Sequence, residues 1–530
     1  MKSCNMPSDA SVVTKSHRAH SVYVGQYYWY LAILVAVASA VLSFSWIGFI
    51  ASDDGYYLQS GLGWLDSFPY VAGHFGTARA TVGIPIAIAM GLVGKNEFSV
   101  VLPTCLYWLG TLSITYIALA KRFSFGFALI TSLAIATVPL FALMATIPSA
   151  DVPELFFCAT SFWLFATSCE QVDRLSSLFG AGAMAALAFI THETAVALVI
   201  FYGILFLLGF AMPRRHYWMM ALGFSVIWGM EMLYYGLLTG DAFYRYHLSM
   251  VGVAIHDRIV VPPFHFDDSG NLHIAKWIDP IVMLLTKHEF SLAFYFVIPA
   301  AIWALRPLRI PTESWDPANR EKSLAWLLAL AGAICLLFAM FALQGLKLLA
   351  RYYMISTYFF LIATAIWVKI ILFYKRPKFT IILIGAVIGV NFLCILADNK
   401  NPRFSERELV NYLSRSTGPV YTDPYTAHLT EQYCKWSGQD CSRIIGAPPR
   451  KNVAFYFNPK SATSPNRFMS PNDVVLYSPK PEWIAIWRPD PEPSVLSSVV
   501  LALGLAPLLP VTVLKKLITP NPLVVVYRSR

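Results

Sequence analysis

The chain has 530 residues, of which 57% are hydrophobic and only 13% carry a charge. Soluble domains carry about 25% charged residues, and the mean hydropathy of +0.56 is too high for a soluble fold. Composition therefore excludes disordered, fibrous, coiled-coil and disulfide-scaffold proteins, and it predicts a polytopic membrane protein. The net charge of +10 is expected of cytoplasmic loops, so we do not take it as evidence for nucleic-acid binding.

Apolar segments follow one another along most of the chain. A helix needs about 20 apolar residues to cross the hydrocarbon core of a bilayer. Eleven segments are predicted to do so: 27–50, 98–120, 123–146, 154–169, 175–190, 193–211, 217–239, 290–305, 323–344, 352–374 and 379–397. The polar N-terminus (1–26) lacks a cleavable signal pattern, so the first span is expected to stay in place as a signal anchor.

The segment ATVGIPIAIAMGLVG (80–94) is apolar but only 15 residues long. The distribution of Lys and Arg decides its location, because these residues accumulate in cytoplasmic loops. With 80–94 kept outside, the cytoplasmic segments hold 15 Lys and Arg in 59 residues, against 8 in the 113 residues of the outer loops. We therefore expect 80–94 to be a helix in the outer interface, with the N-terminus inside and the C-terminus outside.

Three large segments then lie outside the membrane: a first loop (51–97), a middle loop (240–289) and a tail (398–530). Residues 27–397 form the predicted transmembrane domain. The fold class is an all-α polytopic membrane bundle of about eleven helices with a C-terminal extracytoplasmic α/β domain.

Within the tail, 419–423 and 523–528 are strand-like and 405–416 is helical in pattern. Residues 494–513 are apolar enough for a twelfth span, but their two prolines favour a helix of the tail domain. Cys434 and Cys441 are separated by six residues, so a disulfide is expected in an oxidising compartment. Two unpaired thiols remain the alternative.

Carboxylates recur at the predicted outer ends of the spans. Asp53 and Asp54 lie in SDDGYY (52–57), directly after the first span, and Asp151 lies in a seven-residue loop between two spans. Two adjacent acids tend to raise one pKa, which suits a general base. Helix capping is the structural alternative for all three.

Basic residues share this face. Arg79 precedes the interfacial segment, and Arg351 begins a late span with Lys347 one turn earlier. The planar guanidinium can bind two phosphate oxygens at once. Anchoring to lipid headgroups is the alternative interpretation.

Two further outer segments carry polar residues. THET (191–194) supplies His192 and Glu193, but it lacks a second His at helical spacing and does not predict a zinc site. In the middle loop, His256 with Arg258 is the better candidate pair, because long polar loops often cover active sites. Either pair could instead be a solvated turn.

These segments, in this order, resemble the C-type membrane glycosyltransferases. The resemblance is to the bacterial branch related to protein O-mannosyltransferases and the lipid A aminoarabinose transferase, and it spans roughly residues 25–400. The segments that carry it are DDGYY, RATVGIP, GKNEFSVVLPTCLYWLGTLSITYIAL (94–119) with KRF, SADVPE, FGAGAMAALAFITHE (179–193) and ARYY (350–353). The chain departs from the aminoarabinose branch at Tyr56, at Arg79-Ala80-Thr81 and at THE, which leaves the sugar and the acceptor open.

The resemblance implies an inverting glycosyltransferase at the outer face of a bacterial inner membrane. Asp53 would be the base, with Asp54 or Asp151 orienting it or the acceptor. Arg79 and Arg351, with Lys347 nearby, would hold the donor phosphate. The implied donor is a polyprenyl-phosphate hexose or pentose, the acceptor is a lipid, glycan or protein hydroxyl, and no metal or other cofactor is expected to be obligatory.

Two other classes of protein fit the composition. A transporter or lipid-linked sugar flippase would place charge in the middle of a span, and Glu231 is the main residue of that kind. A non-catalytic anchor that presents the tail would leave the acids and bases of the outer face unexplained.

Overall fold

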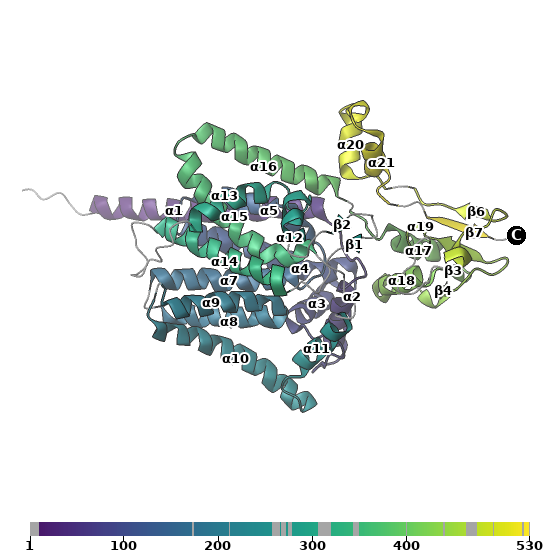
Figure 1. The fold of residues 1–530 in the computed structure, drawn as a ribbon, viewed down its shortest axis with the longest axis horizontal. Helices are drawn as coiled ribbons and strands as arrows, with labels where there is room; N and C mark the ends of the chain where they lie inside the picture. Colours follow the sequence, from purple (N-terminus) through teal and green to yellow (C-terminus); the bar gives the residue numbers. More distant parts are fainter. Residues whose placement is uncertain are drawn as a thin grey trace, which may run out of the picture.

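The computed structural model describes residues 10–171, 174–210, 212–256, 265–266, 272–273, 278–305, 320–342, 349–398, 400–437, 440–462, 474–490, 492–521 and 524–528. Long helices form a bundle along the longest axis of the molecule, and the tail projects from one end (Figure 1). The first helices are α1 (Ala10–Ser45), α2 (Asp54–Asp66), α3 (Ala80–Val93), α4 (Glu97–Ala120), α5 (Phe125–Ala136), α6 (Pro139–Met144), α7 (Asp151–Glu170) and α8 (Leu175–Thr191). They continue with α9 (Val196–Leu208), α10 (Arg214–Thr239), α11 (Tyr244–His256), α12 (Asp279–Thr286), α13 (Ala293–Leu305), α14 (Arg320–Ala342), α15 (Met354–Val368) and α16 (Pro377–Ala397). The strands β1 (His265–Phe266) and β2 (Leu272–His273) form a short antiparallel pair.

Each of the eleven predicted spans contains a helix. Among the described residues, seven helices are long and apolar enough to cross a membrane: Gly25–Ser45, Glu97–Ala120, Asp151–Glu170, Arg214–Thr239, Arg320–Ala342, Ala350–Phe373 and Pro377–Ala397. Shorter apolar helices cover the other predicted spans, and α3 covers the predicted interfacial segment. The chain is therefore a mostly helical, multi-pass membrane protein, while the number of crossings and the orientation stay predictions.

The prediction of one continuous helix over 123–146 is wrong. The structure divides this segment into α5 and α6 at Thr137 and Val138. Val138 is extended, with φ −63° and ψ 123°, and Pro139 begins α6. A proline disfavours the α conformation in the residue before it, so the helix breaks where the sequence places Pro139.

Small residues allow a close contact between α8 and α10. α8 and α10 cross where Gly182 faces the backbone of Met220 and Gly223 faces the backbone of Phe179. A Cβ atom at either glycine would collide with a backbone carbonyl. Glycine therefore allows the two backbones to approach, as at many helix contacts within membranes.

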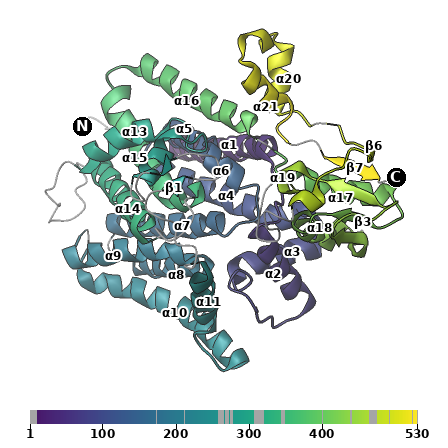
Figure 2. The same cartoon turned by 45° about the vertical axis from the view of Figure 1, so that its right-hand side comes forward.

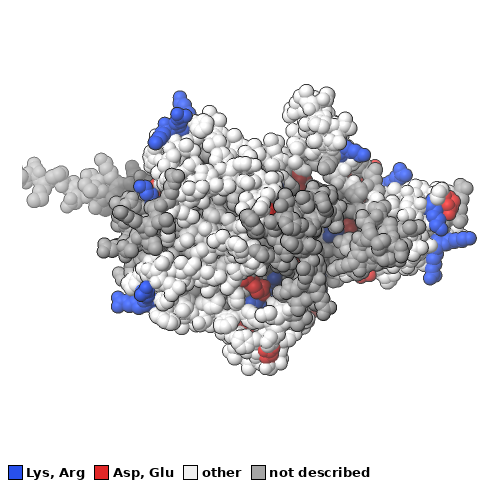
Figure 3. All heavy atoms as spheres, viewed as in Figure 1, with Lys and Arg blue, Asp and Glu red and all other residues white. Residues whose placement is uncertain are grey.

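α2 and α3 pack together at the end of the bundle nearest the tail (Figures 1 and 2). Figure 3 shows Lys and Arg near the start of α16 and the α9–α10 turn, and again on the tail at the other end, with few charges on the flank of the bundle between. The band between the two ends that is poor in charge is expected of a surface that faces lipid.

The tail is a small α/β unit, as predicted. Its sheet has the order β4-β3-β5-β7-β6, with β3 parallel to β4 and β5, and β7 antiparallel to β5 and β6. The elements are α17 (Phe404–Arg415), β3 (Val420–Thr422), α18 (Pro424–Ser437), β4 (Ile444–Gly446), β5 (Ala454–Phe457), α19 (Pro459–Ala462), β6 (Ile484–Trp487), α20 (Val495–Ala502), α21 (Val511–Ile518) and β7 (Val525–Arg528). α17, β3 and β7 confirm the predicted helix and strands.

Two further predictions about the tail are resolved. Cys434 and Cys441 form a disulfide with their Cα atoms 6.0 Å apart. Residues 494–513 do not form one long helix, because α20 ends at Ala502 and a new helix begins after Pro510. No continuous helix of this segment is long enough for a twelfth span, which agrees with the expectation that it belongs to the tail.

Candidate active site

Asp53 and Asp54 have different surroundings although they are neighbours. The chain leaves α1 in an extended segment and turns at Ala51, whose φ is +50°. The turn buries Asp54, whose carboxylate accepts hydrogen bonds of 2.5 Å from the backbone N–H groups of Ile50 and Ser52. Burial raises the pKa of Asp54 to about 6, although these two hydrogen bonds lower it. Asp54 therefore holds the turn together, and Asp53, with its side chain half exposed, is the accessible carboxylate.

Arg351 directs the carboxylate of Asp53. Its Nη2 atom lies 2.5 Å from Asp53 Oδ2. Arg351 also interacts electrostatically with Asp151, which is 7% exposed at the start of α7. The side chain of Asp151 makes no hydrogen bond or ion pair within the described part of the chain. The first loop, the Asp151 loop and the start of a late span thus meet at one point, as the sequence predicts.

Arg79 reaches the same point from the N-terminus of α3. Its side chain is buried, and Nη1 donates a 2.6 Å hydrogen bond to the hydroxyl of Tyr57. Burial alone would lower the pKa of Arg79, but Tyr57, Glu193, Asp151 and Glu154 raise it above its ordinary value. Its buried Nε atom has no hydrogen-bond partner among the described residues. A permanently charged guanidinium with a free donor is suited to binding an anion.

His192 and Glu154 form a second polar group beside Arg79. The hydroxyl of Thr194 donates a 2.6 Å hydrogen bond to Glu154 Oε1 and lies 2.5 Å from His192 Nδ1. Burial, with the positive charge of Arg79, lowers the pKa of His192 to about 4. At neutral pH His192 is therefore uncharged, and it acts as a hydrogen-bonding group.

Glu193 belongs to a row of alternating charges that sequence reasoning missed. Its carboxylate lies 3.6 Å from Arg79 Nη2 and 2.9 Å from Arg245 Nη1. Arg245, from α11 of the middle loop, is only 1% exposed, and its Nε lies 2.9 Å from Glu231 Oε1. Glu231 is thus ion-paired within the protein, which removes the main support for a transport pathway. A buried Arg needs carboxylate partners. Nothing in the sequence shows that the partners of Arg245 are Glu231, 14 positions before it, and Glu193, 52 positions before it.

The tail contacts the segment that leads to Asp53. Arg407 of α17 forms an ion pair with Glu97, in which Nη1 lies 3.1 Å from Oε2. Arg403 donates a 2.6 Å hydrogen bond to the carbonyl of Ile50, and Tyr433 donates one of the same length to the carbonyl of Phe49. The tail therefore fixes the backbone immediately before the accessible carboxylate.

The structure does not describe the side chains of three of the predicted site residues, His256, Arg258 and Lys347. His256 ends α11, but its side chain lies outside the described residues, as do Arg258 and Lys347. His247, from the same loop, pairs at 2.7 Å with Asp241 on the surface instead.

Within the part of the chain that the structure describes, no group of three or more His, Cys, Asp or Glu side chains is arranged to hold a metal ion. Parts of the middle loop lie outside the described residues. Our expectation that no metal is obligatory therefore stays a prediction.

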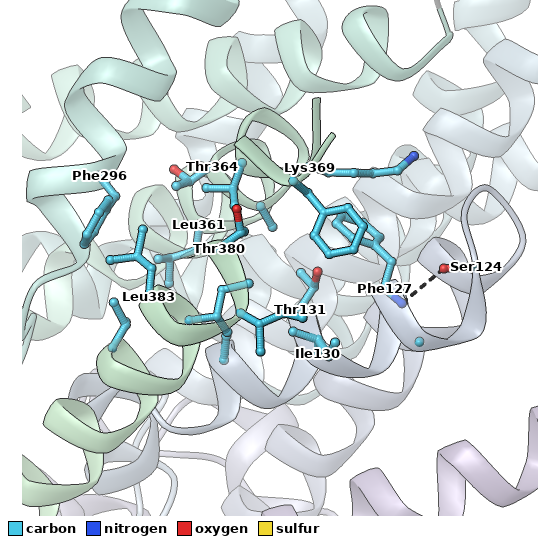
Figure 4. Close-up of a pocket in the computed structure, with 18 of the residues that line it drawn as sticks. Ser124, Phe127, Ile130, Thr131, Phe296, Leu361, Thr364, Lys369, Thr380 and Leu383 are labelled. Carbon is cyan, nitrogen blue, oxygen red and sulfur yellow. Dashed lines mark hydrogen bonds between the residues drawn. The ribbon is translucent and has the colours of Figure 1, made fainter. Parts of the chain in front are cut away.

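An apolar cavity of about 620 Å³ lies elsewhere in the bundle, between α5, α13, α15 and α16 (Figure 4). Phe127, Ile130, Phe296 and Leu383 project into it, and Lys369 and Ser124 lie at its edge. None of the predicted site residues lines this cavity. It can accept hydrocarbon, but the charged site is a separate feature.

Comparisons with known proteins agree on the kind of fold. Residues 82–235 match the family described as dolichyl-phosphate-mannose-protein mannosyltransferase. The apo oligosaccharyltransferase of Archaeoglobus fulgidus is 13% identical, with 82% of this chain and 70% of that chain covered and a TM-score of 0.53. ArnT from Cupriavidus metallidurans in the apo state is also 13% identical, with coverages of 96% and 98% and a TM-score of 0.51. No curated protein sequence gives a match. The resemblance predicted from the sequence is confirmed.

Proposed function

Because residues 82–235 match the dolichyl-phosphate-mannose-protein mannosyltransferase family, we propose that this protein is an inverting glycosyltransferase. It moves a sugar from a polyprenyl-phosphate donor to a hydroxyl acceptor at the side of the membrane that bears the tail. The acceptor is a lipid, a glycan or a protein, and the protein resides in a bacterial inner membrane with its site facing the periplasm.

The observation that carries this proposal is the meeting of Asp53, Arg351, Asp151 and Arg79 at one end of the bundle. Asp53 is half exposed and is held by Arg351, so it can accept a proton from an acceptor hydroxyl. Asp151 lies where it can orient that hydroxyl. These acids would give the chain its base.

Arg79 and Arg351 would bind the donor phosphate. As the bond to the sugar breaks, negative charge accumulates on the leaving phosphate, and buried guanidinium groups stabilise that charge most in the transition state. Arg79 has a donor nitrogen without a partner among the described residues. The hydroxyl attacks the anomeric carbon from the face opposite the phosphate, its proton passes to Asp53, and the phosphate leaves with the bonding electron pair.

The test follows consumption of radiolabelled polyprenyl-phosphate sugars by the purified protein in lipid, with a membrane extract as the source of acceptors. Asp53→Asn should reduce the rate by about 10²- to 10⁴-fold, as removal of a general base does. Asp66→Asn is the matched control, because Asp66 ends α2, the helix that Asp53 precedes, and lies on the surface with Lys95. An unchanged rate in Asp53→Asn would move the base to Asp151. No consumption of any donor would contradict the proposed function.

A further inference from the structure

The α20–α21 hairpin has the composition of a lipid-contacting element, although it belongs to the polar tail. Between Ser494 and Asn521 the sequence holds no acidic residue, and its only charges are Lys515 and Lys516. Ser494 caps α20 by accepting a hydrogen bond from the N–H of Ser497, and Gly504 ends it with φ +66°. The fold of the hairpin is therefore well defined within the tail.

The apolar side chains of the hairpin point outward. Of the eleven large hydrophobic side chains exposed in the described part of the tail, eight lie in the hairpin: Val495, Val499, Leu501, Leu503, Leu505, Leu508, Val511 and Val513. Leu508 is 78% exposed and Val511 80% exposed. Soluble surfaces seldom collect so many apolar side chains in one place, and such a patch marks an interaction site.

The position of the hairpin indicates what covers it. α20 packs against α16, and both views place the hairpin beside the end of α16 nearest the tail, apart from the sheet (Figures 1 and 2). α16 is a candidate span, and Leu393, about one turn before its end at Ala397, is also exposed. The apolar surface of the hairpin thus adjoins a surface that faces lipid, at the level where the span ends.

We propose that the α20–α21 hairpin inserts into the membrane interface of the leaflet on the side of the tail. Its exposed Leu and Val side chains contact the upper part of the acyl chains, and Lys515 contacts anionic headgroups. An interfacial helix of this kind binds through its buried apolar area and through attraction of its basic residues to anionic lipid. The hairpin is therefore a second attachment of the tail to the membrane, in addition to α16.

The test uses the full chain in nanodiscs of phosphatidylcholine and phosphatidylglycerol, in a background in which Cys4 and Cys394 are serine. A single cysteine is introduced as Leu508→Cys or, in the control, as Ile486→Cys, which lies exposed on β6 of the same tail. Each is labelled with an environment-sensitive fluorophore, and quenching by lipids that carry a spin label near the headgroup is measured. We expect several-fold stronger quenching at position 508 than at position 486.

Equal, weak quenching at both positions would overturn the proposal. A label at position 508 that is shielded from water but not quenched by lipid would also overturn it. If that shielding decreases when each nanodisc holds one protein, a second copy of the chain covers the hairpin instead of lipid. Leu503→Asp combined with Val511→Asp should abolish the quenching at 508. Both side chains are exposed, so the tail should still fold. Quenching that survives these substitutions would contradict insertion driven by apolar contact.

Discussion

Replacement of Arg245 by methionine should destabilise the protein through the charges that Arg245 leaves behind. Arg245 is almost fully buried between Glu193 and Glu231. Removal of one partner from a buried ion pair costs about 3–5 kcal/mol, because the remaining charge is not compensated. Glu193 keeps Arg79 at 3.6 Å, so only Glu231 loses its guanidinium partner entirely. We therefore expect a loss near the lower limit, about 3 kcal/mol.

The assay is unfolding of the protein in lipid nanodiscs, followed by intrinsic tryptophan fluorescence. The double variant Arg245→Met with Glu231→Met removes both charges and should recover most of the lost stability, because a buried pair can often be replaced by apolar side chains of similar size. A double-mutant cycle isolates the coupling between the two residues. If the losses of the two single variants simply add, Arg245 and Glu231 do not stabilise one another and the inferred row of charges is wrong.

Three further predictions concern separate parts of the molecule. Asp54→Asn should change the pH dependence of unfolding, because the pKa of Asp54 in the folded protein, about 6, exceeds its ordinary value of 3.8. The contribution of Asp54 to the free energy of unfolding is present below pH 3.8 and falls by about 3 kcal/mol as the pH rises through 6. Unfolding of wild type and variant is compared from pH 4 to pH 7, and free energies that change with pH in the same way in both proteins would refute the prediction. Gly223→Ala should lower the midpoint of thermal unfolding strongly, whereas Gly229→Ala on the same helix, with open space at its Cβ, should not; equal midpoints would contradict the close contact of α8 and α10. Arg407→Ala should reduce donor consumption and increase proteolysis between the bundle and the tail, whereas Arg415→Ala, at the end of the same helix, should change neither. Wild-type activity in Arg407→Ala would show that the tail does not position the first loop.

Much of the site could be predicted because its signals are local. Asp53, Arg79, Asp151 and Arg351 each lie beside the end of an apolar segment, and the positive-inside rule assigns these ends to one face. Once the segments fold as helices, the side chains must gather there. The break at Pro139 also has a local signal, but the prediction of one span over 123–146 misses it, because that prediction follows hydropathy and does not weigh the proline.

Features that depend on distant pairing could not be predicted in this way. Nothing in SDDGYY distinguishes the two acids, and only the turn at Ala51 decides that Asp54 is buried. Arg245 is one of several polar residues in a long loop, and its burial depends on how α11 packs against Glu231 of α10 and against Glu193, just before α9. Such contacts arise from the packing of the helices, which a hydropathy pattern does not encode.

The attachment of the tail to Phe49 and Ile50 has a consequence for the modularity of the protein. A tail taken from a relative would present different side chains to the carbonyls of Phe49 and Ile50 and to Glu97. The recipient would then change the position of Asp53 as well as the surface of the tail. Chimeras that exchange the tail should therefore carry the donor's residues 46–50 and 97 with it. The candidate site and the tail would then have to be exchanged together.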